Sequence, residues 1–451
     1  MTVGPTTAPA PEPGAADGVP AFRPIQYMGS KARLLDPIRA AVDSVDPQRG
    51  RTVDLFSGSG VVAAELGRER PTVAVDVQEY ARVLASALLR PARLGEEEVR
   101  ALAERARELA ELEWLQPLLA YEQEAHEAAG RGDAEPLCHI VEDGSMVALE
   151  LGEGPAAGPL EQLLLEASTP AASAELTLVR HYGGVFFGYA QAALLDCLIS
   201  VVRELPAADR DAGLAAVLGA ASECVTSIGS HFAQPIRPRD RQRRPKPTAL
   251  RAAAQRRGRD PIAIFSRLMG RYADMDPSPH EAEALRSDYR TYLENEERPV
   301  SAIYADPPYT RDHYSRFYHV LETIALGDDP SVSTVTIGSR NVLSRGLYRV
   351  DRHQSPFCIR SQAPDAFAEL FAGARKLEAP LVLSYSPYSS GTAARPEPRL
   401  LTIEALVELA SAHYGEVEAK SVGRFSHSRF NASRLNGEIE AEAETLLLCS
   451  P

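Results

Sequence analysis

Two strand-like runs, each followed by a helical pattern, lie next to each other near the start of the chain and constrain its fold most strongly. Residues 51–66 ("RTVDLFSGSGVVAAEL") have the pattern of a buried strand, a glycine turn and the start of a helix. Residues 71–89 repeat this pattern, with apolar alternation that ends at Asp76. Strands joined in succession by helices pair in parallel, with helices on the faces of the sheet. The sequence therefore predicts an α/β fold.

The strand–helix rhythm stops after residue 90 and returns near residue 300. In between, residues 95–130 carry Ala, Leu, Glu and Arg at helical spacing, and a Gly/Pro-rich break follows at residues 152–159. Strand-like runs return at residues 303–305 and 379–390, and residues 437–450 suit a terminal strand. We therefore expect one α/β core split by an insertion, with a disordered tail at 1–20, the first core part at 21–90, the insertion at 91–285 and the second core part at 286–451.

Composition narrows the class of protein. The apolar share of 44% and the charged share of 24% are those of a globular protein, and no apolar run is long enough to span a bilayer. The five cysteines are scattered without a C-x-x-C pair, which favours a reducing, cytoplasmic location and argues against a disulfide framework. The histidines are not at metal-ligand spacing, so we expect no metal. The net charge of −14 disfavours a nucleic-acid partner unless one region is locally basic.

A glycine-rich turn follows the first predicted strand. Gly58, Gly60 and Ala63 stand at the spacing G-x-G-x-x-A, and Asp76 ends the second strand. Glycines let the backbone turn tightly and approach a ligand, while the carboxylate can accept hydrogen bonds from ribose hydroxyls. NAD and S-adenosylmethionine both contain such a ribose. The turn therefore indicates a nucleoside cofactor without naming the chemistry.

A second motif, Asp306-Pro307-Pro308-Tyr309, follows the run at 303–305. Two prolines cannot continue a sheet, so the segment turns away rigidly. If Asp306 and the Pro307 carbonyl each accept a hydrogen from the exocyclic amino group of a base, the nitrogen can localise its lone pair while Tyr309 stacks on the ring. A sulfonium methyl placed in line then needs no metal, because orientation and electrostatics carry the reaction. A dehydrogenase has no use for this arrangement, so the two motifs together favour methyl transfer.

The order of the motifs resembles a known family. The set comprises "QYMGSKARLL" (26–35), "DLFSGSG" (54–60), "VDV" (75–77), "SDY" (287–289) and "ADPPYT" (305–310). It is similar to the Dam-type, alpha-class adenine-N6-specific DNA methyltransferases, over most of the chain. This resemblance implies a class I S-adenosylmethionine-dependent methyltransferase (Rossmann-like) fold with an inserted, mainly helical target-recognition region. It also implies methylation of adenine N6 in a specific DNA sequence.

The resemblance assigns roles to individual residues. The catalytic residues would be Asp306, Pro307, Pro308 and Tyr309, which bind the target adenine. Asp76 would bind the ribose of S-adenosylmethionine, and Asp288 would lie near its adenine. Where the family's first motif often begins with Lys, this chain has Gln26. The residues expected to bind the cofactor are Tyr27, Gly29, Ser30, Lys31, Asp54, Phe56, Ser57, Gly58, Ser59, Gly60, Asp76, Val77, Asp288 and Tyr289.

Double-stranded DNA is the expected partner, and the target base must be flipped out because its amino group is paired inside a duplex. The DNA contact should be basic despite the acidic total. Residues 237–259 are the densest basic run and contain a single acidic residue, Asp240. No membrane is expected, and a cognate restriction or defence nuclease is expected where the chain belongs to such a system. The predicted DNA-binding residues are Arg237, Arg239, Arg241, Arg243, Arg244, Lys246, Arg251, Arg256, Arg257 and Arg259.

Other interpretations stay open. The motif at residues 306–309 could also serve cytosine-N4 methylation, although such enzymes more often have Ser at the position of Asp306. A non-catalytic DNA-binding regulator would share the fold. Methylation of RNA or of a protein glutamine is less favoured, and cytosine-C5 chemistry is disfavoured because no Pro-Cys pair occurs. Lys31 could instead be a solvated lysine at a helix start and Asp288 an ordinary surface residue. Glu322 is expected to be solvated or to cap a helix.

Overall fold

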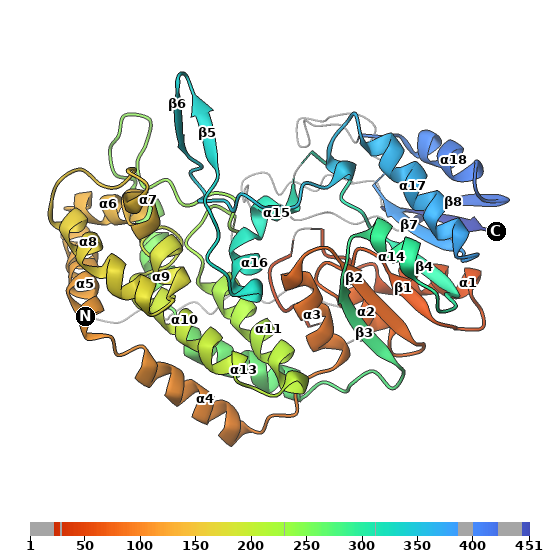
Figure 1. Ribbon diagram of the computed structural model, residues 1–451, viewed down its shortest axis with the longest axis horizontal. Helices are drawn as coiled ribbons and strands as arrows, with labels where there is room; N and C mark the ends of the chain where they lie inside the picture. The colour runs from red at the N-terminus through yellow and green to blue at the C-terminus, as the bar shows by residue number, and fades with distance from the viewer. Residues whose placement is uncertain (1–21, 28, 230, 312, 387–399, 423–443) are drawn as a thin grey trace, which may run out of the picture.

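The structure, a computed structural model, describes residues 22–27, 29–229, 231–311, 313–386, 400–422 and 444–451. The predicted disordered tail at residues 1–20 lies outside these described residues. A seven-stranded sheet occupies one side of the molecule and a group of helices the other (Figure 1).

The strand order of the sheet is β3-β2-β1-β4-β7-β9-β8. The first five strands in this order are parallel, whereas β9 is antiparallel to both of its neighbours. β1, β4 and β7 are buried along their whole length, as expected for strands covered on both faces. The strands are β1 (Thr52–Asp54), β2 (Thr72–Asp76), β3 (Ala282–Arg286), β4 (Ala302–Ala305), β7 (Leu381–Tyr385), β8 (Glu416–Val422) and β9 (Glu444–Ser450).

Helices cover both faces of this sheet because its strands alternate apolar side chains to either side. Val53 and Ile303 face one side, where they join a core with α14 (Tyr289–Asn295), α17 (Ala363–Lys376) and α18 (Ile403–Ser411). Tyr304 and Val382 face the other side, which is covered by three helices. These are α1 (Leu35–Val45), α2 (Val61–Leu66) and α3 (Glu79–Leu89).

Between α3 and β3 the described chain is helical. Several of these helices begin at prolines or at a capping side chain, such as Ser145 before α7 and Asp260 before α13. We call residues 96–273 the helical insertion. Its members are α4 (Glu96–Leu109), η1 (Glu113–Leu115), α5 (Gln116–Gly130), α6 (Glu135–Asp143), α7 (Met146–Glu150), α8 (Pro159–Ser173), α9 (Thr177–Tyr182), α10 (Tyr189–Arg203), α11 (Ala207–Cys224), α12 (Pro247–Arg257) and α13 (Pro261–Ala273).

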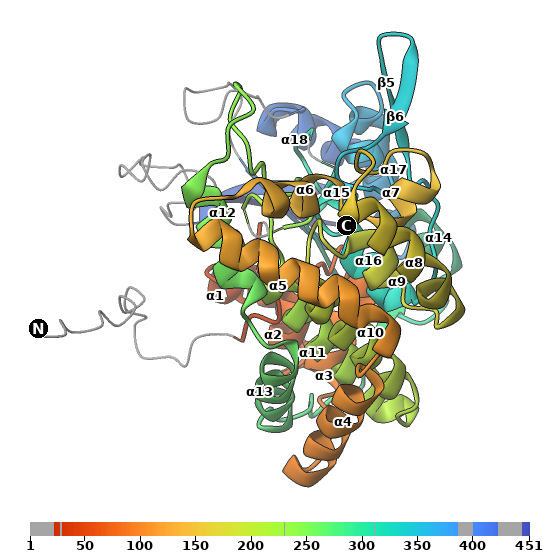
Figure 2. The same cartoon turned by 90° about the vertical axis from the view of Figure 1, so that its left-hand side faces the viewer.

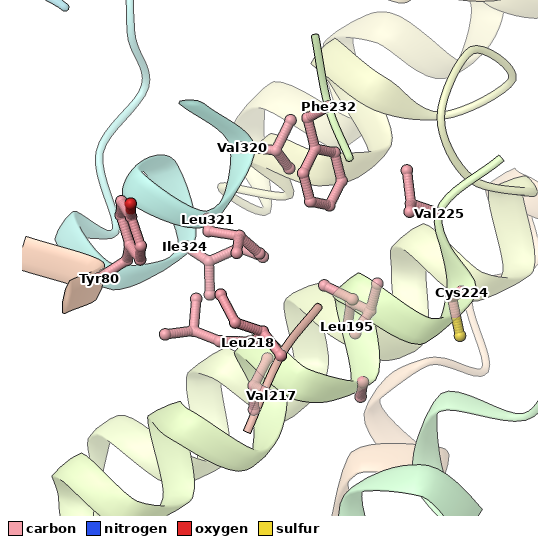
Figure 3. Packing of buried hydrophobic residues seen from close by; sticks show 14 of the residues in the cluster. Tyr80, Leu195, Val217, Leu218, Cys224, Val225, Phe232, Val320, Leu321 and Ile324 are labelled. Carbon is pink, nitrogen blue, oxygen red and sulfur yellow. The ribbon is translucent and has the colours of Figure 1, made fainter. Parts of the chain in front are cut away.

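One helix joins the insertion to the sheet. α16 (His319–Leu326) is buried between α3 and α11, and its Val320, Leu321 and Ile324 pack near Tyr80 of α3 and Leu218 of α11 (Figure 3). The two halves therefore share one hydrophobic core. We call the motif at residues 306–309 the tetrad. The remaining elements follow it: α15 (Tyr314–Phe317), the hairpin of β5 (Thr334–Ile337) and β6 (Arg340–Leu343), and η2 (Pro356–Cys358). The hairpin extends away from the body of the molecule (Figure 2).

The parallel core with its antiparallel β9 confirms the predicted class I methyltransferase fold. β3 begins at Ala282, within the range 91–285 predicted for the insertion, so the sheet resumes a few residues before the predicted boundary. None of the helices in the described ranges is long and apolar enough to cross a membrane.

Candidate active site

Three acidic residues lie at the carboxyl ends of neighbouring parallel strands. Asp54 ends β1, Asp76 ends β2, and Asp306 directly follows β4. β1 lies between the other two strands, with Asp54 in register with Ala74 of β2 and Tyr304 of β4. Open α/β sheets bind their ligands at this edge. The strand order thus brings the two sequence motifs to one place.

The glycine turn after β1 has a geometry that requires glycine. The amide of Gly58 donates to Asp76 Oδ2 at 3.0 Å, and its φ is +51°. A Cβ at Gly58 would lie 2.7 Å from Tyr27 Oη, and one at Gly60 (φ +78°) would lie 2.5 Å from Ala85 Cα. Both positions therefore combine a left-handed conformation with a close approach. Gly60 packs against Ala85 of α3 and so fixes the turn on that helix.

A buried polar network surrounds the tetrad. The ammonium of Lys31 lies 2.7 Å from Asp306 Oδ2 and 3.4 Å from Glu444 Oε1. Glu444 Oε1 also accepts hydrogen bonds from Tyr309 Oη at 3.1 Å and from Ser384 Oγ at 3.0 Å. One glutamate on β9 therefore holds both ends of the tetrad. It contacts Asp306 through Lys31 and binds the hydroxyl of Tyr309 directly.

Burial and charge set the protonation of these groups. Burial raises the pKa of Asp306 to about 6, with Lys31 pulling it down. Burial alone would lower the pKa of Lys31, but the carboxylates of Asp306 and Glu444 outweigh it and the pKa is raised. The pair therefore remains an ion pair at neutral pH. Burial, and then the charges of Asp306 and Asp76, raises the pKa of Asp54 to about 8, so Asp54 is largely protonated at pH 7.

Two adjoining cavities open at this edge of the sheet, and we refer to them together as the pocket. They share Tyr27, Phe56, Asp76, Pro308 and Tyr314. The first is further lined by Gly29, Ser30, Lys31, Asp54, Ser57, Gly58, Ser59, Val61, Val62, Tyr304, Asp306, Pro307 and Tyr309. The second is further lined by Leu55, Val77, Gln78, Tyr80, Ser287, Asp288, Tyr289, Ser315, His353, Ser355, Pro356 and Phe357.

The pocket brings together nearly all of the predicted catalytic and cofactor-binding residues. The four tetrad residues and every predicted cofactor residue except Gly60 line one of its cavities. Lys31 is 7% exposed, so it is not a solvated lysine. Asp288 caps α14, accepting from the amide of Arg290 at 2.9 Å, and also lines the second cavity. Glu322 caps α3 by accepting from the amides of residues 79 and 80, but it is buried and not solvated.

Several pocket residues were not predicted. Tyr314 and Tyr304 line the first cavity, and His353 and Phe357 line the second. Tyr314 lies a few residues beyond the tetrad, so its position near the motif was an available signal. Glu444 gave no such signal, because its role depends on β9 pairing beside β7.

The predicted basic run requires a correction. Arg239 is buried, and its guanidinium bonds Glu135 and Glu142, each at 2.9 Å. Arg257 is also buried, 2.6 Å from Glu122. Their charges are neutralised inside the helical insertion, which does not support the predicted DNA contact at these two positions.

Two further members of the run point inward at least in part. Arg256 donates to the carbonyls of Val225 and Ser227, at 2.9 and 3.1 Å, which removes it from the predicted DNA contact. Arg259 donates to the carbonyl of Glu223 but is otherwise exposed. Half-exposed or exposed members of the run remain candidates: Arg237, Arg241, Arg243, Arg244, Lys246 and Arg251.

Comparison with known proteins agrees with this geometry. The profile of the family described as "D12 class N6 adenine-specific DNA methyltransferase" matches residues 27–118 and 268–351. The first segment contains the glycine turn and the second contains the tetrad. The modification methylase LlaI of Lactococcus lactis subsp. lactis is 29% identical over 190 residues, which are 40% of this chain. The aligned part spans only 27% of that relative's length.

The sheet and the pocket at its edge are consistent with the class I methyltransferase fold. Within this class, the two matched segments are those of the D12 class N6 adenine-specific DNA methyltransferase family, and the resemblance predicted from the sequence is confirmed. The family implies S-adenosylmethionine as methyl donor and DNA as substrate. In the described part of the chain, no group of three or more His, Cys, Asp or Glu side chains is arranged to hold a metal ion.

Proposed function

We propose that this chain transfers a methyl group from S-adenosylmethionine to N6 of an adenine, flipped out of a specific sequence in double-stranded DNA. The observation that supports this best is that the tetrad and the glycine turn, far apart in sequence, line one cavity. A carboxylate beside a cofactor turn is the arrangement that amino-group methylation needs, because the amino nitrogen must face the methyl donor directly.

The glycine-turn side of the pocket fits S-adenosylmethionine. The hydroxyl of Ser57 is buried and forms no hydrogen bond with the described residues, so a polar ligand would satisfy it. Asp76 lies at the junction of the two cavities, with each carboxylate oxygen accepting one backbone amide. A second lone pair on each oxygen can accept a ribose hydroxyl. Bound S-adenosylmethionine would supply an electrophilic methyl group.

The tetrad acts on the target base. Lys31 binds Asp306 Oδ2, so we assign Oδ1 to one hydrogen of the adenine amino group and the Pro307 carbonyl to the other. Both acceptors draw the nitrogen lone pair out of conjugation and aim it across the cavity. The ring of Tyr309, held by its hydroxyl on Glu444, provides a face for the purine. A neutral Asp306 would accept more weakly than the anion, so in this proposal the ion pair with Lys31 keeps Asp306 in its stronger acceptor form.

The setting of the reaction follows from the family. We propose that the protein acts on DNA in the cytoplasm, with the helical insertion contributing to target recognition. The name of the similar protein, modification methylase, supports a restriction-modification context. A cognate nuclease would then cut the same sequence when it is unmethylated, which is part of the proposal.

Replacement of Asp306 tests the catalytic assignment. Asp306→Ala should retain S-adenosylmethionine binding and lose methyl transfer by orders of magnitude, because a contact that acts in the transition state is removed. Asp36→Ala, at a side chain that is 87% exposed on α1, is the matched control and should behave as wild type. Normal turnover of Asp306→Ala would refute the mechanism.

Replacement of Asp76 tests the cofactor site. Asp76→Asn keeps the shape but weakens hydrogen bonds to ribose hydroxyls, so S-adenosylmethionine binding should lose roughly 1.5–3 kcal/mol. Titration calorimetry gives this value directly. Binding of NAD in place of S-adenosylmethionine would contradict the cofactor assignment.

A further inference from the structure

The β5–β6 hairpin stands out from the rest of the fold in both views (Figures 1 and 2). All four residues of β5 are exposed, and Val335 and Ile337 are 45% and 66% exposed despite being apolar. A two-stranded ribbon is marginally stable by itself, and apolar side chains held out in water commonly mark a contact surface. The hairpin therefore needs a partner to account for it.

The two faces of the hairpin differ. Val335 pairs with Val342, and Ile337 pairs with Arg340. Side chains alternate along a strand, so these four share one face, which ends in Arg340 at the tip. Asn341 lies on the opposite face. The tip thus presents an arginine and an asparagine, side chains that can hydrogen-bond the edges of guanine and adenine respectively.

The base of the hairpin carries an exposed arginine on its insertion side. Arg345 follows β6 and donates to the carbonyl of Ile236 at 3.3 Å. Burial lowers its pKa, and the positive charges of Arg237 and Arg243 lower it further, although Glu142 opposes them. Acidic side chains also lie here, since Glu153 accepts from the amide of Leu343 at 2.7 Å and Glu142 lines the same cavity as Arg345. Arg345 itself is exposed and can contact an anionic partner.

On the pocket side, two more arginines flank an aromatic ring. The guanidinium carbons of Arg316 and Arg352 lie 5.3 and 5.0 Å from the centre of the Tyr348 ring. Tyr348 stands just beyond β6, and Arg316 belongs to α15. α15 begins with Tyr314, which lines the pocket. The base of the hairpin thus contacts the short helix that forms one wall of the pocket.

The charge of this segment identifies the kind of partner. The chain as a whole carries −14, yet residues 331–352 contain four arginines and one acidic residue, Asp351. One of the four, Arg349, is buried and paired with Asp328 and Asp351. The others are Arg340, Arg345 and Arg352. A locally basic arm on an acidic protein suits a polyanion better than a second copy of the same chain.

We propose that the β5–β6 hairpin is the arm that enters the major groove of the DNA beside the flipped adenine, with the arginines at its base on the phosphates. This inference rests on the proposed function. The major groove admits a two-stranded β-ribbon, whereas the minor groove is about half as wide. Arg340 is the residue that we assign to base-edge contact, and Arg345 to phosphate contact. The hairpin lies outside the basic run predicted from the sequence.

The test compares two double variants with equal loss of charge. Arg340→Ala with Arg345→Ala removes the hairpin's arginines. Arg100→Ala with Arg131→Ala, at side chains 67% and 66% exposed on α4 and beyond α5, is the matched control. Binding is measured from 50 to 300 mM salt on a fluorescent duplex that contains the sequence methylated by wild type, or on a duplex of random sequence if wild type methylates none. S-adenosylmethionine affinity and methyl transfer to the same duplex are measured alongside.

The hairpin variant should bind the duplex roughly 10- to 30-fold more weakly near 0.15 M salt. Its log–log salt slope should be flatter by about 1, since Arg345 is the assigned phosphate contact and each such contact contributes about 0.9. Its S-adenosylmethionine affinity should equal that of wild type, and the control should match wild type throughout. Arg340→Ala alone should accept substitutions at one base position of the target. Wild-type affinity and slope in the hairpin variant would overturn the inference.

The same experiment separates this inference from the proposed function. If wild type methylates the duplex and the hairpin variant binds and methylates equally well, the hairpin assignment fails alone. If wild type does not methylate DNA but the hairpin variant still loses duplex affinity, the proposed function fails and the hairpin assignment stands. Sedimentation of wild type and of the hairpin variant without DNA tests whether the hairpin instead binds a second copy of the chain. A dimer that the hairpin variant dissociates would assign the arm to self-association and overturn the inference.

Discussion

Lys31 Nζ lies 2.7 Å from Asp306 Oδ2 at the bottom of the pocket, where the lysine is only 7% exposed. A carboxylate buried without a cation would take up a proton, and the neutral group would accept from an amino group more weakly than the anion. The lysine keeps Asp306 ionised near neutral pH, although burial still raises the pKa of that carboxyl to about 6. In the proposed mechanism the ion pair is part of the catalytic arrangement, and its electrostatics make testable predictions.

Removal of Lys31 should change the pH dependence of methyl transfer. Asp306 acts as the anion, so activity is present above its pKa and is lost as the pH falls through about 6. Lys31 lowers that pKa, and Lys31→Met should therefore move the acidic limb of the kcat profile to higher pH, besides lowering kcat. Lys376→Met, at an exposed position of α17, is the control. A limb that stays in place would show that Lys31 does not set the charge of Asp306.

Replacement of Glu444 should move the same limb in the opposite direction. The charge of Glu444 raises the pKa of Asp306, so Glu444→Gln should lower it and extend activity to more acidic pH. The amide oxygen can still accept from Tyr309 and Ser384, which preserves much of the geometry. Glu418→Gln on β8, where the glutamate is 56% exposed, is the matched control. A fall in kcat at all pH values without a shift would indicate a purely structural glutamate.

The ring and the hydroxyl of Tyr309 have separable roles. Tyr309→Phe loses the hydrogen bond to Glu444 but keeps the ring against Tyr385, so much of the activity should remain. Tyr309→Ala loses stacking of about 1–3 kcal/mol with the flipped base. Single-turnover rates at saturating S-adenosylmethionine measure both. Equal losses in the two variants would assign the effect to the hydroxyl.

Asp54 should make the stability of the protein depend on pH. Burial raises its folded-state pKa from 3.8 to about 8, so the folded protein binds this proton more tightly than the unfolded chain. Its contribution to stability is present below about pH 4 and is lost as the pH rises through 8. Asp54→Asn removes this dependence and should gain roughly 1–4 kcal/mol relative to wild type between pH 5 and 8.

Thermal unfolding across that pH range measures the difference. Asp36→Asn, at a side chain 87% exposed on α1, should follow wild type at every pH. A constant offset between Asp54→Asn and wild type would mean that Asp54 is ionised in the folded protein.

The parts of the site that could be predicted from the sequence are those whose conformation is set by neighbouring residues in the chain. A strand followed by glycines, or by two prolines, has few possible conformations, so the positions of Gly58 and Asp306 at the sheet edge follow from the motifs. Glu444 could not be predicted in this way. It reaches Lys31 only because β9 inserts antiparallel beside β7, a pairing that no local pattern encodes.

The basic run shows a second limit of sequence. The sequence shows that this run is densely charged, but charge density along the chain does not tell which side chains face water. Arg239 and Arg257 meet glutamates from α5 and α6, about a hundred residues earlier, and are neutralised there. Isolated charged side chains are not buried without partners, so the partners decide the outcome. From the sequence alone, Arg311, Arg316 and the arginines at residues 340–360 are the alternative DNA contact to this run.

The most direct test of the central claim is the identity of the methylated base. Unmethylated DNA is incubated with the purified protein and S-adenosylmethionine that carries an isotope-labelled methyl group, digested to nucleosides and examined by mass spectrometry. The account predicts labelled N6-methyladenine with wild type and a loss of the label by orders of magnitude with Asp306→Ala. Labelled N4-methylcytosine, or DNA without any labelled base, would contradict it.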